Sequence, residues 1–163
     1  MKALILRFEN RVDNIVKELL NGIDYSGLEF DISHWESYGD DIEGSEYDFN
    51  YMDNIPSEII KRKIIMENNR VNPEFMELFI RKIGTMPKKI YYYKDFLESD
   101  YLISIINCDH RNIEIFSKYE TLLEKMKDNF LRLNLENKYI KEIEHINPMA
   151  VLQAWEFGKG IEY

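Results

Sequence analysis

Apolar positions in the first part of the chain follow strand spacing, then helix spacing, then strand spacing again. Residues 2–9 contain the apolar run ALIL, which predicts a strand. Apolar side chains then recur three and four residues apart over residues 12–23, as in an amphipathic helix, with Asn10 as its cap and Gly22 at its end. Residues 28–33 alternate apolar and polar, which predicts a strand with one solvated face.

The next part of the chain predicts a hairpin with a long acidic connection. Residues 47–51 alternate like residues 28–33, so we expect the two segments to pair. The connection, residues 36–45, is long for a hairpin loop and is the main candidate for a functional loop. A helix is predicted over residues 56–67, with its basic run 61–63 facing water.

The second half of the chain contains one segment of ambiguous spacing. Residues 75–83 lie between helix start and stop signals, which slightly favours a helix, but they also alternate like a strand. Residues 91–100 predict a strand end followed by a short helix. Residues 101–107 predict a strand buried on both faces, in a hairpin with residues 113–116, and residues 119–133 predict an amphipathic helix.

The chain closes with a predicted strand over residues 139–145 and a short helix over residues 147–157. Hairpins mixed with helices predict an α+β fold, in which amphipathic helices pack on a mixed, largely antiparallel sheet. A chain of 163 residues without repeats or an evident linker fits a single domain, residues 1–163.

Acidic side chains are concentrated in one segment. The chain has a formal charge of −9, and residues 18–60 contain twelve Asp and Glu but no Lys or Arg. Such a surface repels polyanions, because nucleic-acid affinity depends on basic side chains that contact phosphates. We therefore expect no nucleic acid and no membrane as a partner, and attraction to a basic protein. A single cysteine, no long apolar run and no cleavable signal indicate a cytoplasmic protein.

The cysteine and the histidines do not form a recognisable catalytic or metal-binding motif. Cys108, Asp109 and His110 are adjacent, and neighbouring side chains on an extended chain point to opposite faces, so they do not predict a nucleophile with its base. His34 and His145 lie far from His110 in the sequence, without ligand spacing. No nucleotide-binding motif is present either. We therefore predict no catalytic residue, no metal site and no cofactor.

The acidic loop and the aromatic residues before it are the predicted binding site. Aromatic side chains supply contact area at low entropic cost, and carboxylates attract a cationic partner. The leading hypothesis is a non-enzymatic, immunity- or inhibitor-like domain that contacts a basic protein. The residues assigned to this contact are Trp35, Tyr38, Asp40, Asp41 and Glu43.

Two other functions stay open. The chain fits an enzyme or small-ligand binder whose pocket cannot be identified from the sequence, because 30 acidic residues offer many pairs of unknown separation. It also fits a structural homo-oligomer that associates through Trp155 and Phe157 near the end of the chain.

One motif and the order of elements indicate a family. The run YKDFLESD, residues 93–100, has the form YxDFLxSD, and Asn107-Cys108-Asp109 is followed by Ile113-Glu114-Ile115-Phe116. With these features the chain resembles, over about residues 1–145, a small uncharacterised family of Gram-positive bacterial proteins, a domain of unknown function. The resemblance implies a strand at residues 75–83. It carries no catalytic residues, and the closing segment with Trp155 departs from the family pattern.

Overall fold

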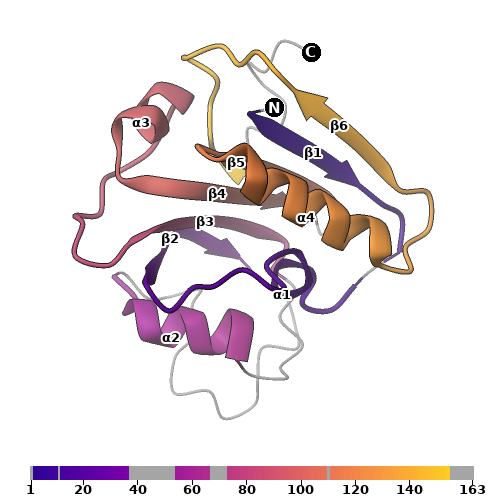
Figure 1. Cartoon of the computed structure of the whole chain (residues 1–163), viewed down its shortest axis with the longest axis horizontal. Helices are drawn as coiled ribbons and strands as arrows, with labels where there is room; N and C mark the ends of the chain where they lie inside the picture. Colours follow the sequence, from indigo (N-terminus) through magenta and orange to yellow (C-terminus); the bar gives the residue numbers. More distant parts are fainter. Residues whose placement is uncertain (1, 11, 37–53, 67–72, 110, 155–163) are drawn as a thin grey trace.

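A computed structural model describes residues 2–10, 12–36, 54–66, 73–109 and 111–154. Its centre is a six-stranded antiparallel sheet in the order β2-β3-β4-β5-β1-β6 (Figure 1). The strands are β1 (Ala3–Arg7), β2 (Leu28–Glu36), β3 (Phe75–Lys82), β4 (Tyr101–Cys108), β5 (Asn112–Ser117) and β6 (Tyr139–Ile143). The helices of these residues are α1 (Ile15–Leu19), α2 (Ser57–Lys61), the π-helical turn η1 (Arg62–Met66), α3 (Tyr93–Glu98) and α4 (Glu120–Arg132). The predicted α+β fold is confirmed.

The sheet is covered on both faces. On the first face, α1, α2, η1 and α4 pack against the apolar side chains of the strands to form the larger core. Burial of that apolar area is the main favourable term in folding. Side chains of this core that are fully buried include Leu4, Leu6, Phe30, Leu78, Ile103, Ile105, Ile115 and Phe130.

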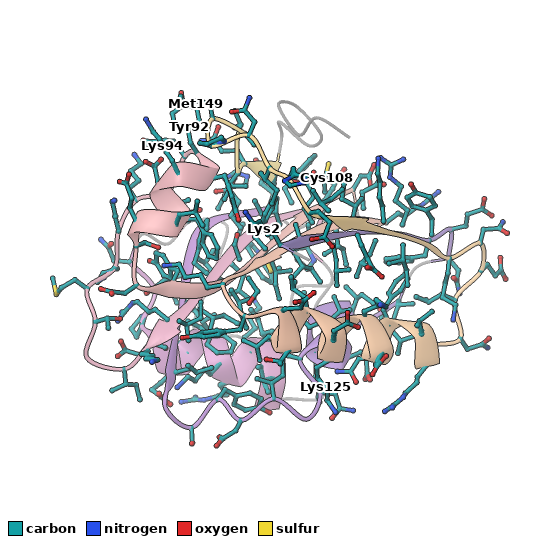
Figure 2. All side chains as sticks on the ribbon, turned by 45° about the horizontal axis from the view of Figure 1, so that its top comes forward. Lys2, Tyr92, Lys94, Cys108, Lys125 and Met149 are labelled. Carbon is teal, nitrogen blue, oxygen red and sulfur yellow. The ribbon has the colours of Figure 1, made fainter. Side chains whose placement is uncertain are left out.

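The second face carries a smaller core under α3 and the end of the described chain. We name residues 147–154 the C-terminal strap. Figure 2 shows Tyr92, Lys94 and Met149 on the side of the sheet opposite Lys125 of α4. The backbone N–H of Leu152 donates to the carbonyl of Tyr91 at 2.8 Å. Side chains of this core include Ile5, Phe79, Phe96, Phe116, Ala150, Leu152 and Ala154.

The strap replaces the helix predicted over residues 147–157. Its described residues form a turn and then an extended segment as far as Gln153, while residues 155–157 lie outside the described part. Asn147 accepts a hydrogen bond from the N–H of Met149 at 2.9 Å, as a capping side chain does, but the chain then extends. The buried strap residues are two positions apart, which is the spacing of an extended chain. The helix prediction did not take this spacing into account.

The first predicted helix is much shorter than its apolar stripe. The stripe does pack in the first core, but α1 begins after Asn14, which has a left-handed backbone with φ of 59°. Asn10, the predicted cap, instead accepts a hydrogen bond from the N–H of Glu136 at 2.8 Å. A left-handed residue cannot continue a helix, so the regular helix starts there.

The prediction that the basic run 61–63 faces water is wrong for two of its three residues. Lys61 and Lys63 are 7% and 5% exposed. Their ammonium groups lie 6.0 Å from the ring centre of Phe30 and 5.3 Å from that of Trp35. Long aliphatic stems and cation–π contacts let these lysines cover apolar rings.

The ambiguous segment at residues 75–83 is a strand. β3 (Phe75–Lys82) pairs with β2 on one side and β4 on the other, and six consecutive residues are buried. The sequence spacing was ambiguous because a strand buried on both faces lacks a solvated stripe. The predicted partner of β2, residues 47–51, lies outside the described residues, as do the loop 37–45 and the oligomer residues Trp155 and Phe157. None of the helices described here has the length and apolarity needed to cross a bilayer.

Removal of one central apolar side chain tests the first core. Ile105 on β4 is 0% exposed, whereas Ile83 after β3 is 55% exposed. We expect Ile105→Ala to lower the free energy of unfolding in urea by roughly 2–5 kcal/mol, because it leaves a cavity. The same change at Ile83 should cost no more than about 0.5 kcal/mol. Equal losses for the two variants would contradict the described core.

Candidate functional site

A cavity of about 480 Å³ opens beside the edge strand β2, on the second face of the sheet. Its walls come from β2, β3, the start of β4, residues 54–56 with the first residue of α2, and residues 87–90 before α3. Polar and apolar side chains both line it, as in small-molecule sites. Its main polar lining residues are Glu29, Asp31, Ser33, Asn54, Ser57, Arg81 and Tyr101.

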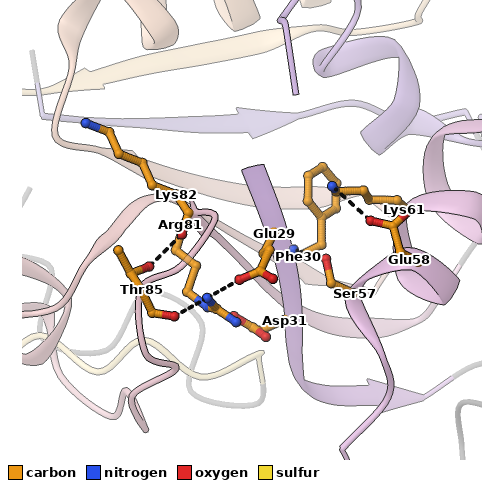
Figure 3. A network of polar contacts seen from close by, with 9 residues as sticks. All are labelled: Glu29, Phe30, Asp31, Ser57, Glu58, Lys61, Arg81, Lys82 and Thr85. Atoms are coloured by element: carbon orange, nitrogen blue, oxygen red, sulfur yellow. Dashed lines mark hydrogen bonds and ion pairs between the residues drawn. The ribbon is translucent and has the colours of Figure 1, made fainter. Parts of the chain in front are cut away.

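A buried arginine organises the polar wall of the cavity (Figure 3). Arg81 of β3 is paired across the sheet with Glu29 of β2, and its side chain is 8% exposed. Its Nε donates to Asp31 at 2.7 Å, and its Nη1 donates to Glu29 and to the carbonyl oxygen of Thr85. A buried charge requires such partners, so the arginine and both carboxylates are held in one arrangement.

The ion pairs keep the arginine charged. Burial lowers the pKa of Arg81, but the hydrogen bond and charge of Asp31, together with the charge of Glu29, outweigh it, and the pKa is raised. Arg81 therefore neutralises one of its two carboxylates. Glu29 and Asp31 remain 30% and 25% exposed, so each can accept further hydrogen bonds.

Two lysines at the rim have their charged groups engaged outside the cavity. The ammonium of Lys88 lies 3.6 Å from Glu98, and that of Lys89 lies 4.8 Å from the ring centre of Tyr91. Neither Glu98 nor Tyr91 lines the cavity. Lys88 and Lys89 therefore line the cavity together with the two carboxylates and the guanidinium of Arg81.

Tyr101 of β4 also lines the cavity. Burial, followed by the charge of Asp31, raises the pKa of Tyr101 to about 12. The phenol therefore keeps its proton near neutral pH, with the negative charge of Asp31 close by. A protonated phenol at this position does not present a proton-accepting group.

A bulge in β2 separates Trp35 from the cavity. Ile32 pairs with Leu78 but His34 pairs with Glu77, so Ser33 is an extra residue in the strand. The bulge reverses the alternation, and Trp35 points into the first core with 4% exposure. A ring buried to this extent contributes packing and not contact area. The other four predicted contact residues, Tyr38, Asp40, Asp41 and Glu43, lie outside the described residues.

The acids of residues 18–60 are partly neutralised by the protein itself. Half of the twelve lie among the described residues. Arg81 pairs with Glu29 and Asp31, Lys61 lies 3.4 Å from Glu58, and the His34 ring lies 3.1 Å from Glu36. The described part of the segment is therefore a cavity wall and a set of local pairs, and not a continuous acidic surface.

The structure places Cys108 in a partly buried position near several carboxylates, which disfavours its thiolate form. Burial, with the charges of Asp109, Glu114 and Glu74, raises the pKa of Cys108 to about 11. Asp109 occupies a left-handed turn position and accepts a hydrogen bond from Asn112 at 2.6 Å. His110 lies outside the described residues. Among the residues that the structure describes, no group of three or more His, Cys, Asp or Glu is arranged to hold a metal ion.

Sequence reasoning did not identify Arg81 or Tyr101 as site residues. Both come from segments whose sequence suggested only buried structure. The available signal was alternation within β3, because Glu77, Phe79 and Arg81 share one face. Two charged residues at this spacing on a doubly buried strand require partners, and the acids of β2 are the adjacent candidates.

Comparison with known proteins assigns the family and no activity. The family model described as a protein of unknown function, DUF2691, matches residues 1–149. It ends before the buried strap residues Ala150, Leu152 and Ala154. No curated protein and no solved structure matches the chain.

Alkylation of Cys108 tests the thiol environment. With its pKa at about 11 and not its ordinary 9.0, the thiolate fraction near neutral pH is roughly 100-fold lower than for a free thiol. We expect iodoacetamide to modify the folded chain about 100-fold more slowly than the chain unfolded in urea at the same pH. Comparable rates for the folded and unfolded chain would show that the cysteine is activated or fully accessible.

Proposed function

The chain belongs to the DUF2691 family, a family of proteins of unknown function, and we propose that it is a protein-binding domain that recognises a basic partner. The observation that supports this proposal is the cavity beside β2 with its two carboxylates. Both of its carboxylates, Glu29 and Asp31, come from the segment that contains no Lys or Arg.

The cavity fits a cationic side chain of the partner. Asp31 and Glu29 place two carboxylates beside the guanidinium of Arg81, and both side chains are partly exposed. A guanidinium or ammonium group that enters the cavity would donate hydrogen bonds to these carboxylates and accept none itself. Phe79 and Ile90 in the same wall would pack against the aliphatic stem.

The loop residues belong to the same proposal. Tyr38, Asp40, Asp41 and Glu43 add charge and one aromatic ring to the segment that supplies the cavity. Carboxylates near a binding site accelerate association with a cationic partner even without direct contact. The same charges disfavour nucleic acid and anionic membranes. We place this interaction in the cytoplasm as part of the proposal.

Binding is favoured over catalysis by the state of the groups in the cavity. Arg81 and Asp31 are engaged in ion pairs, and Tyr101 keeps its proton. Cys108 does not line the cavity. These groups can hold a ligand in position, but none of them is poised to exchange a proton near neutral pH.

A second candidate function is the binding of a free small cation. Its support is the volume of the cavity, about 480 Å³, which lies within the roughly 300–1,000 Å³ common for small-molecule sites. A peptide probe and a free ligand distinguish the two functions, because a protein partner also requires contacts outside the cavity.

A titration with a matched pair of peptides tests the proposal. We expect acetyl-Gly-Arg-Gly-amide to shift the backbone amide resonances of Ser33, Phe79 and Ile90, and the neutral citrulline peptide to leave them unchanged. Glu29→Gln should weaken binding of the arginine peptide about tenfold, because one charged acceptor is lost. Tighter binding of free arginine amide than of the peptide would favour the small-cation function.

Two control variants separate the cavity from the general charge. Asp24→Asn removes one charge from an exposed residue of the same segment, away from the cavity, and should leave the affinity unchanged. Replacing Asp40, Asp41 and Glu43 by their amides should weaken binding at low salt and have little effect at high salt, because salt screens distant charges. An arginine peptide that shifts no cavity resonance in the unmodified chain would refute the proposal.

A further inference from the structure

The C-terminal strap is fastened to the second face of the sheet by its backbone. The N–H of Tyr93 donates to the carbonyl oxygen of Ala150, and the N–H of Leu152 donates to that of Tyr91, both at 2.8 Å. Tyr92 and Val151 form an antiparallel bridge between these two bonds. The alternate strap residues Ala150, Leu152 and Ala154 are each 0% exposed. The strap therefore docks like an added strand with its apolar side chains inward.

A buried glutamate connects the strap to the cavity. Glu77 of β3 is 3% exposed, and its two carboxylate oxygens have different partners. Oε1 accepts the backbone N–H of Ala154 at 2.9 Å, and Oε2 accepts the hydroxyl of Ser33. Ser33 is the bulge residue of β2 and lines the cavity. A buried carboxylate is costly unless its acceptors are satisfied, so loss of one donor weakens the arrangement of the other.

The cavity and the strap also share an apolar wall. Phe79, Ile90 and Tyr101 line the cavity, and the same three side chains belong to the core that Leu152 completes. A strap that leaves its position removes packing from the back of this wall. Close-packed cores change between discrete arrangements and do not deform continuously.

We propose that the seating of the C-terminal strap and the state of the cavity are coupled through Ser33, Glu77 and the shared wall. With the strap seated, Glu77 accepts the hydrogen bond of Ser33, and Phe79, Ile90 and Tyr101 keep their packing behind the cavity. A ligand that changes the position of Ser33 changes the hydrogen bond between Glu77 and Ala154, and with it the equilibrium between the seated and the released strap. Release of the strap in turn changes the affinity of the cavity for the ligand by the same coupling free energy. The regulatory meaning of this coupling rests on the proposed function, whereas the coupling itself is a property of the ligand-free chain.

Amide hydrogen exchange in Ser33→Ala tests the coupling without a ligand. Ser33 has no contact with the strap other than through Glu77 among the hydrogen bonds described above. We expect the variant to exchange the amide proton of Ala154 at least tenfold faster than the unmodified chain. The matched control is Ser57→Ala, which removes another cavity-lining serine that bonds the N–H of Phe30 and not Glu77. It should leave the Ala154 amide unchanged.

A substitution in the strap tests whether the strap affects the cavity. Leu152→Ala should speed exchange at Ala154 and shift the amide resonances of Ser33 and Ile90, whereas Leu97→Ala, at a 48% exposed position on α3, should do neither. Wild-type exchange at Ala154 in Ser33→Ala, or an equal increase in Ser57→Ala, would overturn the coupling. If Leu152→Ala does not fold, Ser33→Ala and Ser57→Ala still test the coupling.

Addition of the arginine peptide separates this inference from the proposed function. A peptide that binds in the cavity should change exchange at Ala154 in the unmodified chain. Binding with unchanged exchange at Ala154 would overturn the regulatory role and leave the binding function intact. Absence of binding would refute the proposed function, and the Ser33→Ala result would then decide the coupling alone.

Discussion

The pairing of the buried Arg81 guanidinium with two carboxylates of the neighbouring strand is the interaction on which the candidate site depends. It places a charge of β3 opposite Glu29 and Asp31 of β2, at the edge of the sheet where a cavity remains open. A buried arginine without these carboxylates would be strongly unfavourable. The same pairing that stabilises the edge fixes the positions of the two partly exposed carboxylates on which the proposed function depends.

Coverage of both sheet faces explains which parts of the fold the sequence predicted. Strands β1, β2, β4, β5 and β6, with the hairpin of β4 and β5, and helix α4 agree with the prediction, because each has a distinct apolar run or apolar spacing. Residues 75–83 stayed ambiguous because both of their faces are buried. The apolar spacing of the sequence does not reveal the bulge at Ser33. Because of this bulge, Trp35, a predicted contact residue, lies in the core.

The site was less predictable than the fold because it is made by pairing between strands. The concentration of acids in residues 18–60 was evident, but Arg81, the residue that orders two of them, is distant in sequence and lay in the ambiguous segment. The strap was predicted as a helix from Asn147 and Pro148, local signals that describe only its first turn. Its extended path depends on Glu77 and on the backbone of residues 91–93, which are tertiary contacts.

A double-mutant cycle between Arg81 and Asp31, followed by urea unfolding, tests most directly whether the ion pair holds the site. Arg81→Met and Asp31→Asn should each destabilise the chain. The loss in free energy of unfolding of the double variant should be smaller than the sum of the two single losses by about 1 kcal/mol or more. Each single change leaves a charged partner unpaired, and the double change does not. Losses that add to within about 0.5 kcal/mol would show that the two side chains do not depend on each other, and would contradict the role given to Arg81.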